Sequence, residues 1–120
     1  MDNNLKSNTA AEFKAAISLC RDIFAKKLQD YGTSWRVMRP SSLTDQIYIK
    51  AKRIRNLEML GEEKAAVDEG IVPEFIGIVN YCAIALIQLS SGIGNTIPAE
   101  EALRLYDEKI EAATSLMIDK

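Results

Sequence analysis

Hydrophobic residues recur at helical spacing in four stretches of the chain, and no stretch alternates as a β-strand would. The first stretch is marked by apolar residues three and four positions apart: Phe13, Ile17, Cys20, Phe24 and Leu28. Thr9 and Glu12 have the spacing of a capping box before this stripe, and Gly32 suits the left-handed conformation that ends a helix. We therefore predict a first helix from Thr9 to the Asp30-Tyr31-Gly32 sequence.

A second helix is predicted from about Leu43 to Leu60, because apolar residues again follow one face: Leu43, Ile47, Ala51, Ile54 and Leu57. Pro40 precedes it and Gly61 ends it. Residues 62–72 are expected to form one short helical turn and then a loop. Pro73 suits the first position of a third helix, which continues to Leu89. This segment is apolar on nearly every side, so we predict a buried central helix, Pro73–Leu89.

A fourth helix is predicted to start near Pro98, because Glu100 and Glu101 in its first turn favour the helix dipole. The fold class is therefore all-α, a bundle of about four helices with short antiparallel connections. We expect residues 1–8 to be a disordered N-terminus and residues 9–120 to form a single helical domain. Four helices leave little protein to cover a central helix that is apolar all round, so we also expect a homo-oligomer.

Composition narrows the range of functions. The 120-residue chain contains no histidine, which excludes Ser-His and Cys-His catalysis and most zinc sites. Cys20 and Cys82 lie within apolar helical patterns and are predicted to be buried free thiols. The polar N-terminus does not resemble a signal peptide, and the apolar stretch Phe75–Leu89 is short for a membrane span. We predict a soluble cytoplasmic protein with no membrane partner.

Charge is distributed unevenly along the chain. The net charge is −2, yet residues 36–55 carry six basic residues and one acidic residue, so the rest of the chain has a net charge of −7. The basic residues of this segment are Arg36, Arg39, Lys50, Lys52, Arg53 and Arg55. A basic segment on an acidic protein favours a small anionic ligand, and it makes nucleic acid an unlikely partner because DNA-binding domains are usually basic overall.

Lys50 is the most informative of these residues, because at about 100° per residue it points into the apolar stripe of the second helix. Arg53 flanks the stripe. A charge on a core-facing side is costly unless it meets an opposite charge, so Lys50 should pair with a carboxylate or bind an anion. Asp30, at the end of the first helix, is a candidate partner. A purely structural ion pair, or a buried stem with an exposed amine, explains the same pattern.

Two further features fit a nucleotide. Trp35, with Tyr31 before it and Arg36 after it, could stack on a base while the guanidinium group binds phosphate. Trp35 could equally fill the core between the first two helices. Asn80 lies among apolar residues of the third helix and must be hydrogen-bonded, either to a base edge or to another helix.

Acidic residues gather around the junction of the second and third helices: Glu58, Glu62, Glu63, Asp68, Glu69 and Glu74. Carboxylates that converge there could hold Mg²⁺, and Asp68 and Glu69 are the candidate ligands. A solvated acidic turn is the alternative interpretation. The sequence contains no glycine-rich phosphate loop, no CxxC pair and no nucleophile elbow.

Several of these residues occur in an order that resembles the nucleotide-modification-associated domain family. The elements of the resemblance are KxxDYG at Lys27–Gly32, Trp35, KAKRIRNL at Lys50–Leu57, Asp68-Glu69 and Asn80-Tyr81, within residues 10–90. This family is remotely similar to the all-α MazG-like nucleotide pyrophosphohydrolases, which are usually oligomeric and bind magnesium through acidic pairs on neighbouring helices. The resemblance therefore implies an all-α fold and a nucleotide ligand.

The chain departs from the acidic pattern of its relatives on both helices. Ile49 stands where relatives carry an aspartate before the lysine, and Pro73 and Gly77 stand where they carry two acids after Glu69. The resemblance thus supports the fold and the ligand class more than it supports catalysis.

We predict a protein that binds a nucleotide or another phosphorylated small molecule through Asp30, Tyr31, Trp35, Arg36, Lys50, Arg53 and Asn80. One alternative is a Mg²⁺-dependent nucleotide pyrophosphohydrolase that uses Glu69. The other is a non-catalytic protein-interaction module, in which the basic segment docks an acidic partner.

Overall fold

The computed structural model describes the backbone of residues 3–60 and 63–119, and the side chains of residues 8–60, 63 and 66–118. Four α-helices follow one another along the chain: α1 (Asn3–Tyr31), α2 (Pro40–Met59), α3 (Lys64–Ser91) and α4 (Ala99–Asp119). A short 3-10 helix, η1 (Ser34–Val37), lies between α1 and α2. The described residues include no strand. The predicted all-α fold of about four helices is confirmed.

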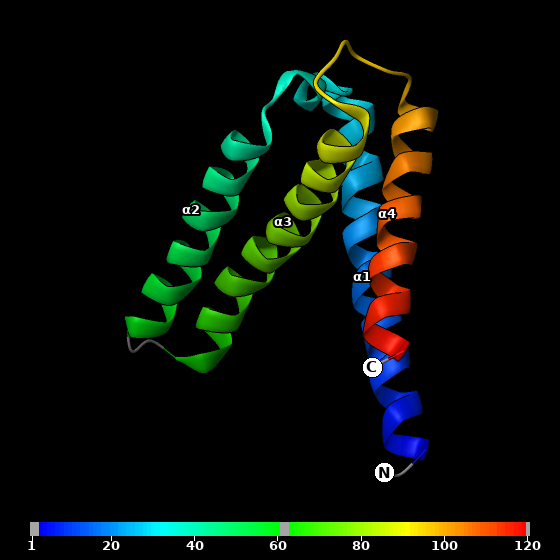
Figure 1. Ribbon diagram of the computed structural model, residues 1–120. Coiled ribbons are helices and arrows are strands. Elements are labelled where there is room, and N and C mark those ends of the chain that lie inside the picture. The colour runs from blue at the N-terminus through cyan, green and yellow to red at the C-terminus, as the bar shows by residue number, and fades with distance from the viewer. Residues whose placement is uncertain (1–2, 61–62, 120) are drawn as a thin grey trace.

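The helices alternate in direction and form two antiparallel pairs, α2 with α3 and α1 with α4 (Figure 1). The pairs approach each other at the end that carries η1 and the α3–α4 loop, and they diverge toward the opposite end (Figure 1). The core lies at the first of these ends, where buried side chains of all four helices meet: Phe24, Leu28, Leu43, Ala83, Ile84, Ile87, Ala102 and Tyr106. Within it, the rings of Phe24 and Tyr106 stack with centroids 4.2 Å apart.

Most predicted helix ends agree with the structure. Gly32 (φ 66°) follows α1 with the positive φ that the sequence predicts. Gly92 follows α3 with a positive φ as well, but its ψ of 167° is extended rather than left-handed helical. Pro40 occupies the first turn of α2, so this helix begins slightly earlier than predicted. The start of α1 differs more, because this helix begins at Asn3 rather than Thr9. The predicted stop at Gly61 falls outside the described residues.

The predicted start of the third helix at Pro73 is wrong. The helix begins at Lys64, and Pro73 lies inside it. A proline removes one backbone hydrogen bond from a helix interior, so local propensity favours a break at this position. Packing against α2 outweighs that preference, since the position of Gly70, before the proline, already lies against the side chain of Leu57.

Burial of α3 is one-sided. Ala83, Ile84 and Ile87 are buried, whereas Phe75 and Leu89, on another side of the helix, are exposed. Cys20 is buried as predicted, but the prediction for Cys82 is wrong because this thiol is exposed. The sequence pattern could not reveal this, because α3 is apolar on the exposed side as well.

Because α3 is longer than the apolar stretch seen in the sequence, its length no longer argues against a membrane span. The helical residues Ala66–Ser91 include an 18-residue window with a mean hydropathy of 1.8, long and apolar enough to cross a bilayer by length and composition alone. The core helix of a soluble protein can satisfy the same test. In this helix, the polar side chains of Asn80 and Gln88 are buried and hydrogen-bonded to other segments of the chain, so at least that side of the helix faces protein.

Candidate functional site

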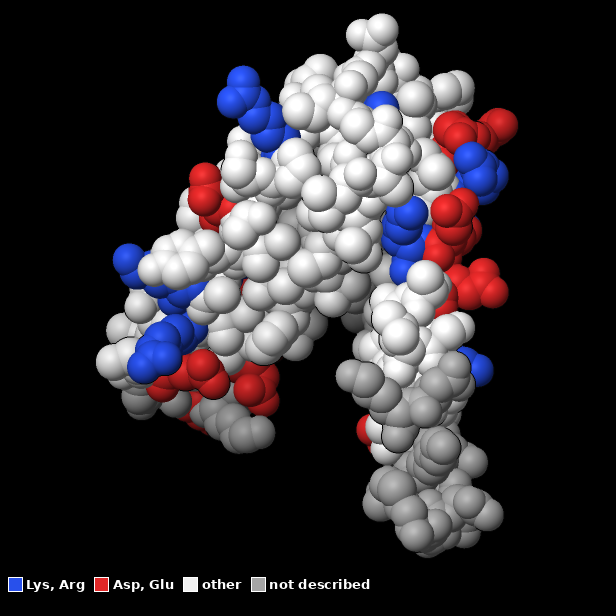
Figure 2. All heavy atoms as spheres, viewed as in Figure 1, with Lys and Arg blue, Asp and Glu red and all other residues white. Residues whose placement is uncertain are grey.

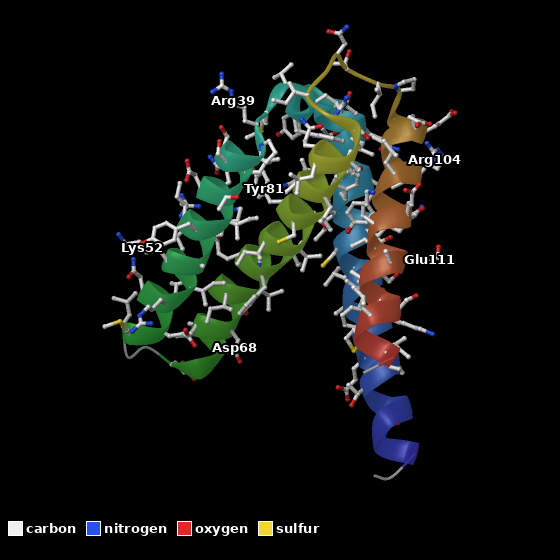
Figure 3. The ribbon with its side chains drawn as sticks, viewed as in Figure 1. Arg39, Lys52, Asp68, Tyr81, Arg104 and Glu111 are labelled. Atoms are coloured by element: carbon white, nitrogen blue, oxygen red, sulfur yellow. The ribbon has the colours of Figure 1, made fainter. Side chains whose placement is uncertain are left out.

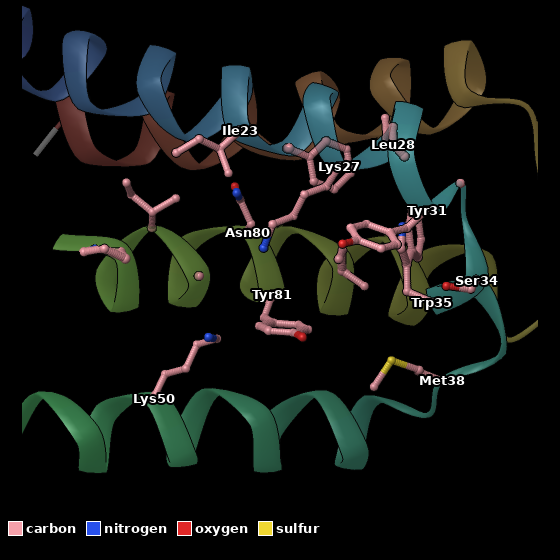
Figure 4. A pocket seen from close by; sticks show the side chains of 16 residues that line it. Ile23, Lys27, Leu28, Tyr31, Ser34, Trp35, Met38, Lys50, Asn80 and Tyr81 are labelled. Atoms are coloured by element: carbon pink, nitrogen blue, oxygen red, sulfur yellow. The ribbon is translucent and has the colours of Figure 1, made fainter. Parts of the chain in front are cut away.

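A pocket of about 600 Å³ lies between α1, α2, α3 and the η1 segment. Its walls come from the C-terminal part of α1, from residues 32–38, from Lys50 of α2, and from α3 between Pro73 and Ile84 (Figure 4). Of the predicted ligand-binding residues, four line this pocket: Tyr31, Trp35, Lys50 and Asn80. Three others do not line it: Asp30, Arg36 and Arg53.

Lys50 points from α2 toward α3, as its place in the apolar stripe predicts (Figure 4). Its Nζ lies 3.4 Å from Oε2 of Glu74 and 5.7 Å from the centroid of the Tyr81 ring. The distance to Glu74 is at the long end for a hydrogen bond, and Glu74 is shared with Arg53, whose Nη1 is 3.7 Å from Oε1. Lys50 therefore shares this carboxylate with a second cation.

The predicted pairing of Lys50 with Asp30 is wrong. Asp30 is exposed at the end of α1, close to where the chain turns toward α2. Lys50 lies ten residues into α2, which is about 15 Å along the helix axis. Glu74 takes the role instead, because α3 runs antiparallel beside α2 and brings its first half against this part of α2.

Gly77 makes room for the lysine. A Cβ added at this position would lie 2.7 Å from Cε and 2.8 Å from Cδ of Lys50, closer than real side chains approach one another. The lysine stem therefore crosses α3 directly over the glycine. Because the residue at position 77 has no side chain, the Lys50 amine can reach the pocket instead of being deflected toward solvent.

Lys27 is a pocket residue that the sequence-based site did not include. It lines the pocket from α1, and its side chain extends toward α3 across the space from Lys50 (Figure 4). A signal was present, since Lys27 opens the KxxDYG element and lies one helical turn before Tyr31. No aspartate or glutamate lines the pocket among the described residues, so its charged lining groups are two lysines.

The aromatic side chains lie mainly toward the η1 end of the pocket. Trp35 is half-buried, with its ring 6.3 Å from that of Phe24, so it packs on the core and also forms part of the pocket wall. Tyr31 is exposed at the end of α1, and Tyr81 lies on α3 between Trp35 and Lys50 (Figure 4). Both interpretations of Trp35 thus hold in part, as a core residue and as a pocket residue.

Asn80 lines the pocket, but its amide joins three helices. Its Nδ2 donates to the carbonyl oxygen of Cys20 in α1 at 3.1 Å, and its Oδ1 accepts from the Tyr106 hydroxyl of α4 at 2.7 Å. Burial raises the pKa of Tyr106 above its ordinary value, which keeps this hydroxyl a donor. The helix-to-helix interpretation of Asn80 accounts for these contacts.

Arg36 lies outside the pocket, in the buried end of the bundle. Its Nη1 donates to Oε1 of Gln88 and, at 2.7 Å, to the carbonyl oxygen of Gly92. Gln88 in turn donates to the carbonyl oxygens of Arg36 and Met38, each at 2.8 Å. These contacts, which we name the Arg36–Gln88 clasp, fix the η1 segment to the end of α3. They could not be predicted, because Gln88 appears in the sequence only as an interruption of an apolar run.

The basic segment does not form a single patch. Arg36 is buried, Lys50 faces the pocket, and Arg39 and Lys52 point outward from α2 (Figure 3). Lys and Arg side chains consequently appear along the outer edge of α2 rather than as one cluster (Figure 2). The local excess of positive charge in the sequence therefore overstates the charge available to one ligand.

Asp68 and Glu69, the candidate magnesium ligands, lie near the start of α3 and are exposed, away from the pocket (Figure 3). Consecutive residues of a helix point about 100° apart, so the two carboxylates do not converge. Among the described residues, no three His, Cys, Asp or Glu side chains form a group that could hold a metal ion. The assignment of Asp68 and Glu69 as magnesium ligands therefore stays a prediction from the sequence.

Comparison with known proteins connects the pocket to a family. The nucleotide modification associated domain 1 family matches residues 27–89, which is just over half of the chain. All residues that line the pocket fall within this segment, except Ile23 and Phe24. No curated protein and no solved structure matches the chain significantly. The chain belongs to the nucleotide modification associated domain 1 family.

Proposed function

We propose that the pocket binds a nucleotide or a closely related phosphorylated small molecule. The observation that carries the proposal is the convergence of Lys27 and Lys50, from different helices, on a pocket that no carboxylate lines among the described residues. The family description, which associates this domain with nucleotide modification, supports the same ligand class.

The charges favour a phosphate between the two lysines. Glu74 is the carboxylate near Lys50, and it also faces Arg53. Two cations thus share this one carboxylate, Lys27 lines the same pocket, and a phosphate would supply further negative charge. An ammonium group binds phosphate as a compact point charge with three donors, so Lys50 retains donors for a ligand after its long contact with Glu74.

The remaining pocket surface suits the base and sugar. A volume of about 600 Å³ is within the usual range for small-molecule sites. Trp35, Tyr31 and Tyr81 offer aromatic faces on which a base could stack, and such rings contribute large contact areas at low entropic cost. A phosphate near the lysines and a base near Trp35 and Tyr31 would use both ends of the pocket.

Catalysis is not part of the proposal. A magnesium-dependent pyrophosphohydrolase needs converging carboxylates, whereas neither Asp68 nor Glu69 lines the pocket. Pro73 and Gly77, which stand where relatives carry acids, are pocket residues here. The likeness to the MazG-like enzymes remains a prediction from sequence.

Calorimetric titration tests the assignment. The panel is orthophosphate, ribose 5-phosphate, a nucleoside, and the nucleoside mono-, di- and triphosphates of each base. We expect a nucleotide to bind at least tenfold more tightly than its nucleoside or than orthophosphate. Lys27→Met and Lys50→Met should each weaken binding about tenfold, the equivalent of about 1.4 kcal/mol.

Matched controls are available on the same helices. Lys26→Met and Lys52→Met remove the same charge from α1 and α2 at exposed positions outside the pocket, so they should leave affinity nearly unchanged. If all four variants weaken binding equally, the effect is one of net charge and not of the pocket. If no phosphorylated compound in the panel binds, the proposal is wrong.

A further inference from the structure

One side of α3, roughly opposite the pocket, carries a row of apolar residues that we name the α3 stripe: Val72, Phe75, Val79, Cys82, Leu86 and Leu89. Phe75 is 54% exposed and Leu89 67% exposed. The surface along α3 above its acidic end is largely uncharged in Figure 2. Successive members are three or four residues apart, the spacing of a seam between two packed helices, so the stripe has the shape to receive another helix.

Charge restricts the partner. The chain has no Lys, Arg, Asp or Glu between Glu74 and Glu100, so nothing on this part of α3 could pair with a charged side chain. A charged partner would lose hydration without gaining an ion pair. An uncharged apolar surface of similar length therefore matches the stripe, and the α3 stripe of a second copy is such a surface.

The spacing is also self-complementary. The intervals along the stripe are three, four, three, four and three residues, a series that is the same when read backwards. An antiparallel copy related by a two-fold axis can therefore meet it residue for residue, as an isologous interface requires. In that register Val72 meets Leu89 of the second copy, Phe75 meets Leu86, and Val79 meets Cys82.

We propose that this protein forms a homodimer through antiparallel packing of the α3 stripe against the α3 stripe of a second copy. The pocket opens on the other side of α3, so both copies keep an accessible pocket. The dimer does not depend on the identity of the ligand, and it can form whether or not the proposed function is correct.

Sedimentation velocity tests the association. The mass derived from the sedimentation of the wild-type protein should be twice the 13.3 kDa of one chain. Leu86→Glu should sediment as a monomer with an unchanged circular dichroism spectrum, because its side chain already lies partly in solvent. Leu116→Glu, an equally drastic change at an exposed leucine of α4, should remain a dimer. A wild-type monomer, or a Leu86→Glu dimer, would overturn the proposal.

Cysteine pairs test the register. Val72→Cys and Leu89→Cys are made separately in a Cys82→Ser background, in which the remaining thiol, Cys20, is buried. The two proteins are mixed, unfolded and refolded under reducing conditions, and then oxidised. We expect a disulfide-linked dimer from the mixture and little from either protein alone. Parallel packing would instead give disulfide-linked dimers of each variant with itself and none that joins the two variants. That result would overturn the antiparallel arrangement.

A lipid surface is the competing occupant of the stripe. Flotation with phosphatidylcholine vesicles distinguishes it, since the dimer should stay in the protein fraction. Flotation of the wild-type chain that is abolished by Leu86→Glu would overturn the proposal in favour of membrane binding.

Discussion

Two basic residues are brought inside the helical bundle, and the protein holds them in different ways. Arg36 lies in the buried end, where its Nη1 binds both Gln88 and the carbonyl oxygen of Gly92. Lys50 lies at the wall of the pocket, with its Nζ 3.4 Å from the carboxylate of Glu74, which it shares with Arg53. Arg36 is enclosed by the fold and its Nη1 binds groups of the fold, although its buried Nε has no hydrogen-bond partner among the described residues. The Lys50 amine instead lies at the pocket wall, where its remaining donors can reach a ligand.

Hydrogen-bond partners also distinguish two other pocket residues, Asn80 and Lys27. Asn80 touches the pocket, but its contacts with Cys20 and Tyr106 make it part of the structural network, like Arg36. Lys27 belongs with Lys50, because its side chain extends into the pocket from α1 and the described residues give it no ion pair. Hydrogen-bond partners therefore separate structural from ligand-facing residues better than position in the chain does.

Replacing Arg36 should have the largest effect on folding. Arg36→Ala removes donors from the buried Gln88 side chain and from the carbonyl oxygen of Gly92, and it removes a packed side chain. We expect a loss of about 3 kcal/mol in the free energy of unfolding. Urea unfolding followed by circular dichroism measures it. Arg39→Ala, at an exposed position nearby, should change stability by less than about 0.5 kcal/mol.

The nucleotide affinity of the same variant tests whether Arg36 also takes part in ligand binding. Under conditions where Arg36→Ala is fully folded, its affinity should fall only slightly, because the guanidinium group does not line the pocket and acts there only by holding the η1 segment in place. A folded variant with strongly reduced affinity would return Arg36 to the ligand-binding residues and would undermine the division between the two cations.

Tyr106 should show a smaller, pH-dependent effect. Tyr106→Phe leaves Oδ1 of Asn80 without its donor, which should cost about 1–2 kcal/mol at pH 8. Burial raises the pKa of Tyr106 above its ordinary value, so the unfolded chain loses this proton first as pH rises. The advantage of the wild-type protein should therefore shrink above about pH 10, the ordinary pKa of tyrosine.

Urea unfolding of both proteins at pH 8 and at pH 10.5 measures this change. Tyr48→Phe is the control, since Tyr48 is exposed and its hydroxyl should contribute equally in the folded and unfolded chains. A difference between wild type and Tyr106→Phe that stays constant with pH would mean that the buried hydroxyl is not kept neutral by the fold.

Gly77 links helix packing to the pocket. In Gly77→Ala the new methyl group would occupy the space of Lys50 Cε, and the flexible lysine end would have to move. Alanine is the better helix former by up to about 1 kcal/mol, so stability should stay constant or rise. Nucleotide affinity should fall about tenfold, the opposite direction. Gly70→Ala contacts Leu57 outside the pocket and should leave affinity unchanged.

The place of Gly77 in the α2–α3 hairpin shows which features of the structure the sequence could predict and which it could not. Helical periodicity is a local signal, and it predicted α2, α4 and the end of α1 correctly. It also predicted that the Lys50 side chain points toward the interior. The start of α3 depends on packing across the α2–α3 hairpin, which overrides the local preference of Pro73. In that hairpin Leu57 of α2 lies against Gly70 of α3. Lys50, seven residues earlier in α2, lies against Gly77, seven residues later in α3, so both pairs follow one antiparallel register.

Without the start of α3, this register could not be found, and Glu74 could not be recognised as the partner of Lys50. The Arg36–Gln88 clasp was equally hidden, because it joins residues 52 positions apart in the chain. Contacts of this kind are set by tertiary structure. The fold class and the inward lysine were therefore predictable, whereas the partners that define the role of each cation were not.

Glu74 allows the finest test of the comparison, with the smallest expected effect. Glu74→Gln keeps the shape of the side chain but leaves Lys50 and Arg53 without their carboxylate. If Glu74 competes with the ligand for Lys50, nucleotide affinity should rise about threefold, close to 0.7 kcal/mol. The rise should be larger at low salt, because screening weakens exposed charges. Glu111→Gln, on α4 and far from the pocket (Figure 3), makes the same change in net charge and should have little effect. A fall in affinity for Glu74→Gln alone would mean that Glu74 positions Lys50 for the ligand instead of competing with it, and Lys50 would then resemble Arg36 in depending on a fixed partner.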